Sequence, residues 1–540
     1  MRREQVFHGW GEPGAGPSLP PHAGELLRSE LGLSGEVVSR PVALEDVRLP
    51  PSALPAAVRA RLGDVRDDRE ARVLRTRGKS YLDLVASRAG DFASAPDAVV
   101  APADVAGVCE VLRVCADAGV AVVPFGGGTS VVGGLAGERG PFEALISLDL
   151  GRLDRLVSVD RRSLVAVFEP GMRLPEADAA LREHGLALGH VPQSYEWATV
   201  GGCVATRSAG QTSTGHGRID EQVVGVECVT PAGSLATLEV PASAAGPSLR
   251  ELVLGSEGTL GVITRVALHV RPRVEAAYDA WTFGSFRQGA DALRTLAQAG
   301  LAPDIARLSD EEETRLSVAL AGGGSGAAPR AGGASGGAAE LAQRLASRGR
   351  GALGRRLLAG RCLLVCGWQG AHGRATAAVR LARLGARPLG PAPGRAWAAS
   401  RFAGPHLRDD LLDRGAVVET VETATTWSNL EAVYRAVQAA LRGFHVGCHV
   451  SHVYPTGASL YFTVLGRQDP DPAAQWRAAK DAVTRAVVGA GGTLTHHHAI
   501  GRDHAPYLGG EIGELGLELL QAVKARCDPA GVMNPGKLLP

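Results

Sequence analysis

Three consecutive histidines, His496, His497 and His498, are the residues of this sequence best suited to proton transfer. An imidazole titrates near neutral pH, so it can relay a proton or bind a metal ion. Because side chains alternate between the two faces of a strand, one histidine or the outer two would face a site in an extended segment. The flanking sequences GGTLT and AIGRDH are typical of a buried loop after a strand. We therefore favour a functional site here over a surface cluster of histidines.

A glycine-rich loop of different chemistry covers residues 125–131 (FGGGTSV) and directly follows an apolar strand. Consecutive residues without side chains let backbone N–H groups converge on an anion, and a pyrophosphate is the natural ligand. A Rossmann loop would open a helix and would precede an acidic residue by about 20 positions. VVGGL follows instead, so NAD binding is not expected. A plain glycine hairpin remains the alternative for this loop taken alone.

Two later loops favour a cofactor site over a hairpin. In the segment 194–210, Thr199, Gly201 and Gly202 precede small and hydroxyl-bearing residues that let an extended ligand lie against the backbone. The segment 255–264 joins a tight turn to a strand. Each loop is moderately specific, but the order and spacing of the three loops together are highly specific.

The three loops resemble the FAD-binding domain shared by vanillyl-alcohol oxidase, D-lactate dehydrogenase and the flavin-binding component of glycolate oxidase. This resemblance implies that residues 125–131 hold the pyrophosphate of FAD. It also implies that 193–199 and 205–208 serve the flavin and ribityl region, with backbone contacts from 257–263. The cofactor-binding residues that it implies are Pro124, Phe125, Gly126, Gly127, Gly128, Thr129, Ser130, Val131, Gln193, Ser194, Thr199, Gly201, Gly202, Ala205, Thr206, Arg207, Ser208, Glu257, Gly258, Thr259, Leu260, Gly261, Val262 and Ile263. Some relatives bind FAD covalently through a histidine in the first loop; this loop has none, so we expect non-covalent FAD.

The elements that would position these residues mix helices with strands. Val105, Val108, Leu112 and Cys115 recur at helical spacing after Asp104, a residue suited to cap the helix. Short apolar or alternating runs closed by turn residues predict strands, among them VAVVPF, ALISLDL, SLVAVFEPG and VVGVECV. This half of the chain is therefore expected to contain both helices and strands.

A second α/β layer begins near residues 271–273. Helical patterns lie near 285–300, 373–384, 428–442 and 472–489, and the runs CLLVCGW and SLYFTVLG predict strands. The expected fold class is α+β, with a two-subdomain FAD-binding domain of the PCMH type (vanillyl-alcohol-oxidase-like) and an α/β cap domain for the substrate. The expected boundaries are an N-terminal arm or lead-in at 1–94, the FAD-binding domain at 95–272, the cap domain at 273–500 with a flexible Gly/Ala-rich loop at 321–340, and a C-terminal helix and tail returning to the FAD-binding domain at 501–540.

The composition is that of a globular enzyme. A formal net charge of +1 over 540 residues gives no field that would attract nucleic acid. Eight scattered cysteines, several of them inside apolar runs, favour a reducing cytoplasm. No uninterrupted apolar stretch approaches the roughly 20 residues that a membrane span needs. We expect a cytoplasmic protein that does not bind nucleic acid.

Further motifs extend over nearly the whole chain: HGWG, RGKSYLDLVASRAGDF, FGGGTSV, SYEWATVGG, GSEGTLGVIT, ARLSD, HLRDDLLDRGAVVETVETATTW, SLYFT and the triple histidine. Together they resemble the alkyldihydroxyacetonephosphate synthase family of ether-lipid formation. The resemblance implies that Tyr461 transfers a proton with the help of His496 to His498. It implies that Arg408 binds the substrate phosphate near Thr420 and that Arg307 assists catalysis. A planar, always-charged guanidinium suits a dianionic phosphate.

The reaction implied by this resemblance exchanges the acyl chain of acyl-dihydroxyacetone phosphate for a long-chain alcohol. It involves no net redox change, and the oxidised flavin serves as an electrophile. We expect a small or lipid-like phosphate substrate, peripheral membrane contact and a homodimer. His406 and Gln193 depart from the family pattern. Two alternatives stay open: an FAD-linked oxidoreductase of a 2-hydroxy acid or related alcohol, and a flavin-binding protein without catalysis.

A zinc site is the remaining alternative, because Cys448, His449 and His452 lie upstream of the triplet. The 2-hydroxy-acid dehydrogenases have patterns like HxGDGNxH and EHGIG at the two positions, which supply metal ligands and a base. This chain has HVYPTGASLY and HHHAIG instead, without those acidic residues. We therefore expect no bound metal.

Overall fold

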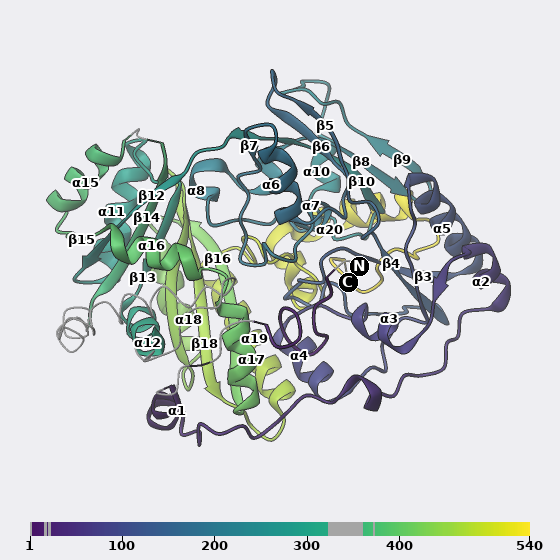
Figure 1. The fold of residues 1–540 in the computed structure, drawn as a ribbon, viewed down its shortest axis with the longest axis horizontal. Helices are drawn as coiled ribbons and strands as arrows, with labels where there is room; N and C mark the ends of the chain where they lie inside the picture. Colours follow the sequence, from purple (N-terminus) through teal and green to yellow (C-terminus); the bar gives the residue numbers. More distant parts are fainter. Residues whose placement is uncertain (1–2, 16–18, 20–22, 322–359, 371–372, 540) are drawn as a thin grey trace. The chain divides into compact units, whose positions relative to one another are not determined.

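The computed structural model describes residues 3–15, 19, 23–321, 360–370 and 373–539, which form two compact units (Figure 1). Unit 1 comprises Met1–Arg40, Gln211–His216 and Val274–His496, and unit 2 comprises Pro41–Gly210, Gly217–Arg273 and His497–Pro540. The lead-in expected at 1–94 is thus divided between the two units. The Gly/Ala-rich loop expected at 321–340 lies, after Ala321, outside the described residues.

The first sheet of unit 2 is mainly parallel. Its strand order is β1-β2-β4-β3, with β1 antiparallel at one edge. The strands are β1 (Val65–Arg66), β2 (Ala98–Val100), β3 (Val120–Phe125) and β4 (Ala144–Asp149). Parallel strands are usually covered on both faces, and accordingly nearly every residue of β3 is buried.

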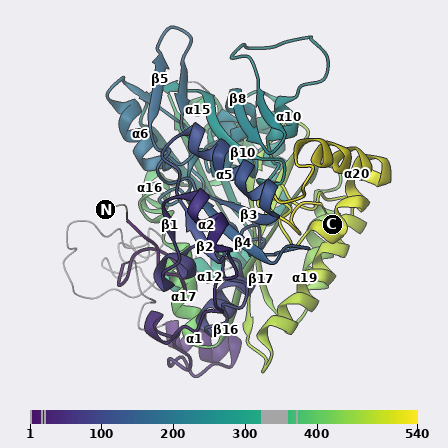
Figure 2. The same ribbon diagram turned by 90° about the vertical axis from the view of Figure 1, so that its right-hand side faces the viewer.

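Helix α5 (Val105–Ala118) packs on β3, and α2 (Ala56–Leu62) packs on α5 (Figure 2). The Asp104 carboxylate accepts a hydrogen bond of 2.8 Å from the Gly107 N–H, which satisfies one of the amides exposed at the helix start. Gly119 ends α5 in the left-handed conformation. The helix predicted after Asp104 is confirmed.

The second sheet of unit 2 is antiparallel, in the order β5-β6-β10-β8-β9. Its strands are β5 (Leu156–Asp160), β6 (Val165–Phe168), β8 (Val223–Thr230), β9 (Gly233–Ala236) and β10 (Val262–His269), and a separate two-stranded pair joins β7 (Leu186–Ala187) to β11 (Arg271–Pro272). The helices of this region are α6 (Leu174–Arg182), α7 (Val200–Ala205), α9 (Ile219–Gln222) and α10 (Arg250–Val253). A buried apolar cluster joins α6 and α7 to the inner strands β6, β8 and β10.

Unit 1 contains a seven-stranded sheet in the order β15-β12-β14-β13-β17-β18-β16, and every neighbouring pair in it is antiparallel. Its strands are β12 (Ala276–Phe283), β13 (Ile305–Ser309), β14 (Cys362–Gln369), β15 (Arg387–Gly390), β16 (Ala416–Thr426), β17 (His445–Val453) and β18 (Gly457–Arg467). The runs CLLVCGW and SLYFTVLG are therefore strands, as predicted.

The helices of unit 1 include the four that the sequence predicts, α11 (Phe286–Gln298), α15 (Arg374–Arg383), α18 (Leu430–Ala440) and α19 (Pro472–Gly489). Four more were not predicted: α1 (Ala23–Leu31), α12 (Glu311–Ala321), α16 (Pro391–Ser400) and α17 (Gly404–Asp413). A single turn, α8 (Ser213–His216), contacts β13 and β17. The unpredicted α17 carries Arg408 and packs on β16.

The segment 41–94 contributes to the core of unit 2, although the sequence suggests only an arm. It contains η1 (Leu44–Asp46), α2, α3 (Arg69–Leu74) and α4 (Tyr81–Arg88). Ser80 and Asp83 form a reciprocal capping box at the start of α4, and Tyr81 and Leu84 are fully buried. The three α-helices have only six to eight residues, so each is too short to show sustained periodicity in the sequence.

The C-terminal segment contains η2 (Ala505–Tyr507) and α20 (Leu508–Cys527), which is the helix expected there, with Asp528 as its C-cap. Val532 and Asn534 then hydrogen-bond to the backbone of Val122 in β3, which places the tail beside the parallel sheet. Among the described residues, we find no helix with both the length and the apolar character that crossing a membrane requires.

Candidate functional site

The first two glycine loops pack directly on each other in unit 2. A Cβ added to Gly126 would lie 2.6 Å from Thr199 Oγ1, and one added to Gly127 would lie 2.2 Å from the carbonyl oxygen of Trp197. Real Cβ atoms do not approach so closely, so no other residue fits without moving the second loop. The sequence attributes these glycines to contact with an anion; the structure shows that close packing between loops also requires them.

The third loop joins the other two. Gly255 N–H and Glu257 N–H donate to the carbonyl oxygens of Val204 and Ala205, at 3.1 and 2.9 Å. A Cβ on Gly258 would lie 2.9 Å from Pro124 Cγ, directly before the first loop. The structure therefore brings together three loops that are separated by 62 and 44 residues in the sequence.

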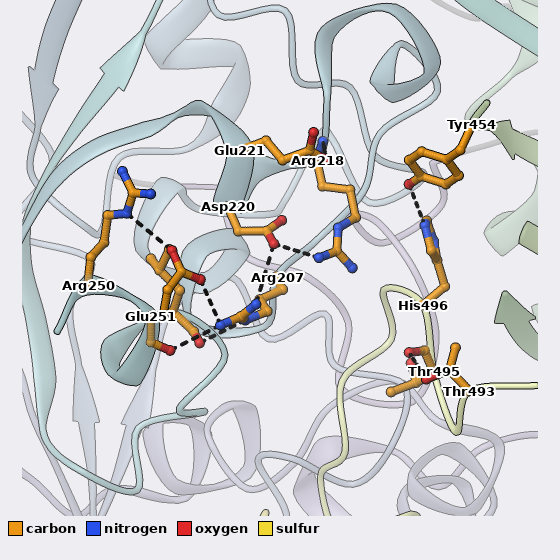
Figure 3. A network of polar contacts seen from close by, with 11 residues as sticks. Arg207, Arg218, Asp220, Glu221, Arg250, Glu251, Tyr454, Thr493, Thr495 and His496 are labelled. Carbon is orange, nitrogen blue, oxygen red and sulfur yellow. Dashed lines mark hydrogen bonds and ion pairs between the residues drawn. The ribbon is translucent and has the colours of Figure 1, made fainter. Parts of the chain in front are cut away.

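Arg207 binds the second loop to the third through its side chain (Figure 3). Its guanidinium donates to the Leu254 carbonyl oxygen at 2.9 Å and forms ion pairs with Glu251 at 3.0 Å and Asp220 at 3.6 Å. Asp220 is also paired with Arg218 at 2.6 Å. The resemblance implies cofactor contact for Arg207, and these bonds also give its side chain a structural function within the protein.

The first loop offers accessible backbone that fits a pyrophosphate. Gly126, Gly127, Thr129 and Ser130 are only partly buried, while Phe125 at the end of β3 is 5% exposed. A ligand can thus reach loop atoms that small residues leave uncovered. The contacts among the three loops fix this surface before any ligand binds. This favours binding, because the loops lose little conformational entropy when the ligand arrives.

Unit 1 brings Arg307, His449 and Tyr461 together from three adjacent strands. In the register of the sheet, Ser309 of β13 faces His449 of β17, and His449 faces Tyr461 of β18. The rings of His449 and Tyr461 are stacked, with centroids 4.9 Å apart and an interplanar angle of 29°. Residues paired across antiparallel strands have side chains on the same face, so the register alone accounts for this contact.

His449 is held between two charged groups. Arg307 Nη1 donates to His449 Nε2 at 3.1 Å, and His449 Nδ1 lies 2.8 Å from Glu313 Oε1. Arg307 Nη2 donates to the same Glu313 oxygen at 2.9 Å. Because a guanidinium can only donate, Nε2 must accept and Nδ1–H must donate to Glu313. Burial and Arg307 lower the pKa of His449, which agrees with a neutral imidazole.

Tyr461 is kept as a neutral phenol. Burial raises its pKa to about 12, although a hydrogen bond with the Thr420 side chain acts in the opposite direction. Thr420 lies on β16, the strand next to β18. The structure therefore places three of the predicted site residues, Arg307, Thr420 and Tyr461, in one polar cluster of unit 1. At neutral pH the Tyr461 hydroxyl can donate a proton or a hydrogen bond.

The histidine triplet lies in a loop of bends, not in a strand, so the expected alternation of faces does not apply. His496 is 6% exposed, and its Nε2 lies 2.7 Å from the Tyr454 hydroxyl (Figure 3). His497 and His498, which begin the last segment of unit 2, are partly buried and contact each other edge to face at 4.8 Å.

Glu422 anchors the start of the triplet to the sheet of unit 1. Its carboxylate accepts hydrogen bonds from the Thr495 hydroxyl and, at 2.8 Å, from the His496 N–H. Glu422 also faces Tyr461 in the register between β16 and β18. His496 and Tyr461 are thus attached to neighbouring points of one sheet.

Arg408 is half-buried on α17, and the N-terminal HGWG motif contacts the same helix. The Trp10 N–H donates to the Asp409 carboxylate at 2.6 Å. A Cβ on Gly9 would lie 2.5 Å from Asp409 Oδ2, and one on Gly11 would lie 2.5 Å from His406 Cε1. The motif therefore serves as a close-packed support for the helix that carries Arg408.

The sequence did not identify Glu313, Glu422 or Tyr454 as members of the site. The two glutamates lie more than 70 positions from the histidines that they bind, so the sequence gives no signal for them. For Tyr454, the one signal in the sequence is its position two residues after His452. Cys448 and His449 do not fit a single zinc site, because they are adjacent on β17 and point to opposite faces. Both ring nitrogens of His449 are also engaged by Arg307 and Glu313.

Comparison with known proteins agrees with this architecture. Residues 96–239 match the family described as "FAD binding domain", and residues 272–538 match "FAD linked oxidases, C-terminal domain". A solved structure of p-cresol methylhydroxylase with substrate bound has a TM-score of 0.64 at 16% identity, over 90% of this chain and 98% of that one. The PCMH-type fold is therefore confirmed, and the chain is an FAD-dependent enzyme.

Relatives with higher sequence identity show which family the chain belongs to. An alkyldihydroxyacetonephosphate synthase from Dictyostelium discoideum is 31% identical over 546 residues, which cover 95% of this chain and 87% of that protein. A solved structure of alkyldihydroxyacetonephosphate synthase has a TM-score of 0.82 at 26% identity, over 98% of each chain. The chain belongs to the alkyldihydroxyacetonephosphate synthase family.

Proposed function

We propose that this enzyme exchanges the acyl chain of acyl-dihydroxyacetone phosphate for a long-chain alcohol. The observation that carries the proposal is the cluster in which neutral Tyr461 stacks on His449, whose tautomer Arg307 and Glu313 fix. A phenol that stays protonated at neutral pH is suited to proton transfer at the C1 carbon of a dihydroxyacetone unit. Family membership supports the same reaction.

Each group of residues has a separate role in the proposed reaction. Arg408 binds the substrate phosphate with Thr420 nearby, and Arg307 fixes the imidazole of His449 beside Tyr461. Tyr461 and the histidines of the triplet move the proton at C1. The three glycine loops of unit 2 hold FAD without a covalent bond, and the bound flavin supplies the electrophile. We also propose the domain boundaries expected from the sequence, with the FAD-binding domain at 95–272 and the cap domain at 273–500.

An oxidoreductase acting on a 2-hydroxy acid is the second candidate, favoured by the match of residues 272–538 to FAD-linked oxidases. Two assays on the purified holoenzyme separate the candidates. Acyl-dihydroxyacetone phosphate and hexadecanol should yield the alkyl ether and free fatty acid, measured by mass spectrometry. Anaerobic addition of D-lactate or glycolate should leave the flavin oxidised. Bleaching by the hydroxy acid without ether formation would replace the first candidate with the second.

We infer further that the enzyme works in the cytoplasm, contacts a membrane peripherally and forms a homodimer. The described cysteines are all unpaired, which suits a reducing compartment. A long-chain alcohol partitions into bilayers, which favours transient membrane contact. Light scattering of the purified protein tests the dimer, and flotation with phosphatidylcholine vesicles tests the contact.

A further inference from the structure

Glu257 has an unusual backbone conformation for a residue with a side chain. It lies in the third glycine loop with φ at +53°, in the left-handed region that glycine adopts at lower cost. Its side chain is also nearly buried, at 8% exposure. A buried carboxylate is unfavourable unless hydrogen bonds compensate for the lost water. A glutamate at this position therefore needs a specific use for its side chain.

The carboxylate of Glu257 binds the backbone that directly follows the histidine triplet. Oε1 accepts a hydrogen bond of 2.9 Å from the Ile500 N–H, and Oε2 accepts one of 2.8 Å from the Gly501 N–H. We call residues 497–501 the histidine loop. Both carboxylate oxygens are thus used on two consecutive amides of this loop, a bidentate arrangement that fixes position as well as distance.

The other side of the histidine loop is fixed by the segment after the first glycine loop. Val132 carbonyl oxygen accepts from the N–H groups of Arg502 and Asp503, at 3.0 and 3.2 Å. Gly501 has φ at +55°, and a Cβ there would lie 2.2 Å from the same carbonyl oxygen. The histidine loop therefore lies between the first and third flavin loops, all within unit 2.

Asn534 of the C-terminal tail completes this assembly. Its side-chain amide donates to the carbonyl oxygens of Glu257 at 2.7 Å and Gly134 at 3.2 Å. The third flavin loop is thus attached to the segment behind the first loop as well as to the histidine loop. A shift of Glu257 would change all three segments together.

We propose that Glu257 is a positioning residue, whose carboxylate holds His497 and His498 at a fixed distance from the flavin loops. This assigns the side chain a use beyond the backbone contacts expected of residues 257–263. The inference rests on the proposed function only where it assumes that the two histidines serve the reaction. The structural link between Glu257 and the histidine loop is independent of that function.

Glu257→Gln tests the proposal, because the amide keeps the size of the side chain but can accept through only one oxygen. We expect kcat per bound FAD to fall roughly 10- to 100-fold, the usual effect of misplacing a reacting group. KM and FAD content should stay within about twofold. Hydrogen exchange of a peptide covering 497–503, followed by mass spectrometry, should become faster. Glu169→Gln is the matched control, since Glu169 is also buried in unit 2, at 5% exposure, and accepts from the Arg155 N–H at 3.0 Å.

The outcomes separate this inference from the proposed function. The positioning role would be rejected if Glu257→Gln kept the wild-type kcat per bound FAD. It would also be rejected if the variant lost FAD while its kcat per bound FAD stayed unchanged. If the wild-type enzyme forms no alkyl ether, the proposed function fails, and hydrogen exchange still decides whether Glu257 holds the loop. If Glu257→Gln does not fold, Glu257→Asp replaces it, because it keeps the charge and should show a smaller change in the same direction. Unchanged exchange in that variant would also reject the role.

Discussion

His449 and Tyr461 stack ring on ring, with centroids 4.9 Å apart, because they face each other across β17 and β18. Arg307 and Glu313 prevent the imidazole from rotating by binding both of its nitrogens. The ring of Tyr461 therefore stacks on an imidazole whose orientation is fixed. This relationship makes Tyr461 the first residue whose role should be tested.

Tyr461→Phe removes only a hydroxyl. We expect kcat to fall by roughly 100-fold or more, the usual contribution of a positioned proton-transfer group, while FAD content and KM stay nearly unchanged. Steady-state kinetics with the ether-forming assay measures both parameters. Tyr278→Phe is the control, because Tyr278 lies on β12 of the same sheet and contacts Trp397 instead. A near-normal kcat in Tyr461→Phe would mean that the ring serves only for packing.

The pH dependence of kcat should reflect the raised pKa of Tyr461, about 12. A raised pKa keeps the protonated phenol present to higher pH, and the protonated form is lost only as the pH rises through about 12. An unperturbed tyrosine would instead lose its proton around pH 10. We therefore expect no alkaline decline of kcat due to Tyr461 below about pH 10. A decline centred near pH 9 that disappears in Tyr461→Phe would contradict this.

Arg408→Lys should mainly affect substrate binding. Lysine keeps the positive charge but lacks the planar fork that binds a phosphate through two parallel hydrogen bonds. Loss of one charged hydrogen bond, about 1.5–3 kcal/mol, corresponds to a KM roughly 10-fold higher or more, with kcat little changed. Arg435→Lys is the control, because Arg435 is exposed and pairs with Glu431 on α18. An unchanged KM would remove Arg408 from the phosphate site.

FAD should be present and non-covalent. The purified protein should be yellow, and acid precipitation should release the flavin into the supernatant. Gly127→Val should abolish FAD binding, since its Cβ would collide with the Trp197 carbonyl oxygen and separate the first two loops. Gly510→Val is the control, because a Cβ there meets open space. Flavin that stays with the precipitate would disprove the non-covalent attachment.

Activity should persist after dialysis against EDTA. His449 cannot act as a metal ligand without losing its bonds to Arg307 and Glu313, and His496 Nε2 is 2.7 Å from the Tyr454 hydroxyl. Elemental analysis of the active protein should show no stoichiometric zinc. Chelator-sensitive turnover together with one zinc per chain would overturn this prediction and support the oxidoreductase alternative.

The sequence by itself determined the class of protein and many local features. The order of the glycine loops predicted an FAD-binding domain, and the first loop's lack of histidine excluded a covalent bond at that place. Helix α5 was readable because Asp104 caps it and its apolar residues repeat at helical spacing. Such features depend on neighbours within a few positions, and a local pattern records them completely.

Only the tertiary structure decided which side chains act together. The hydrogen bonds of three glutamates to the histidines and their loop (Glu313 to His449, Glu422 to His496, Glu257 to Ile500 and Gly501) join residues between 74 and 244 positions apart, and no periodicity links such distant partners. The structure also gave a second reason for Gly127, because a Cβ there would lie 2.2 Å from the carbonyl oxygen of Trp197. Sheet register placed His449 on Tyr461, and register depends on pairing between strands, which the local sequence of either strand does not contain.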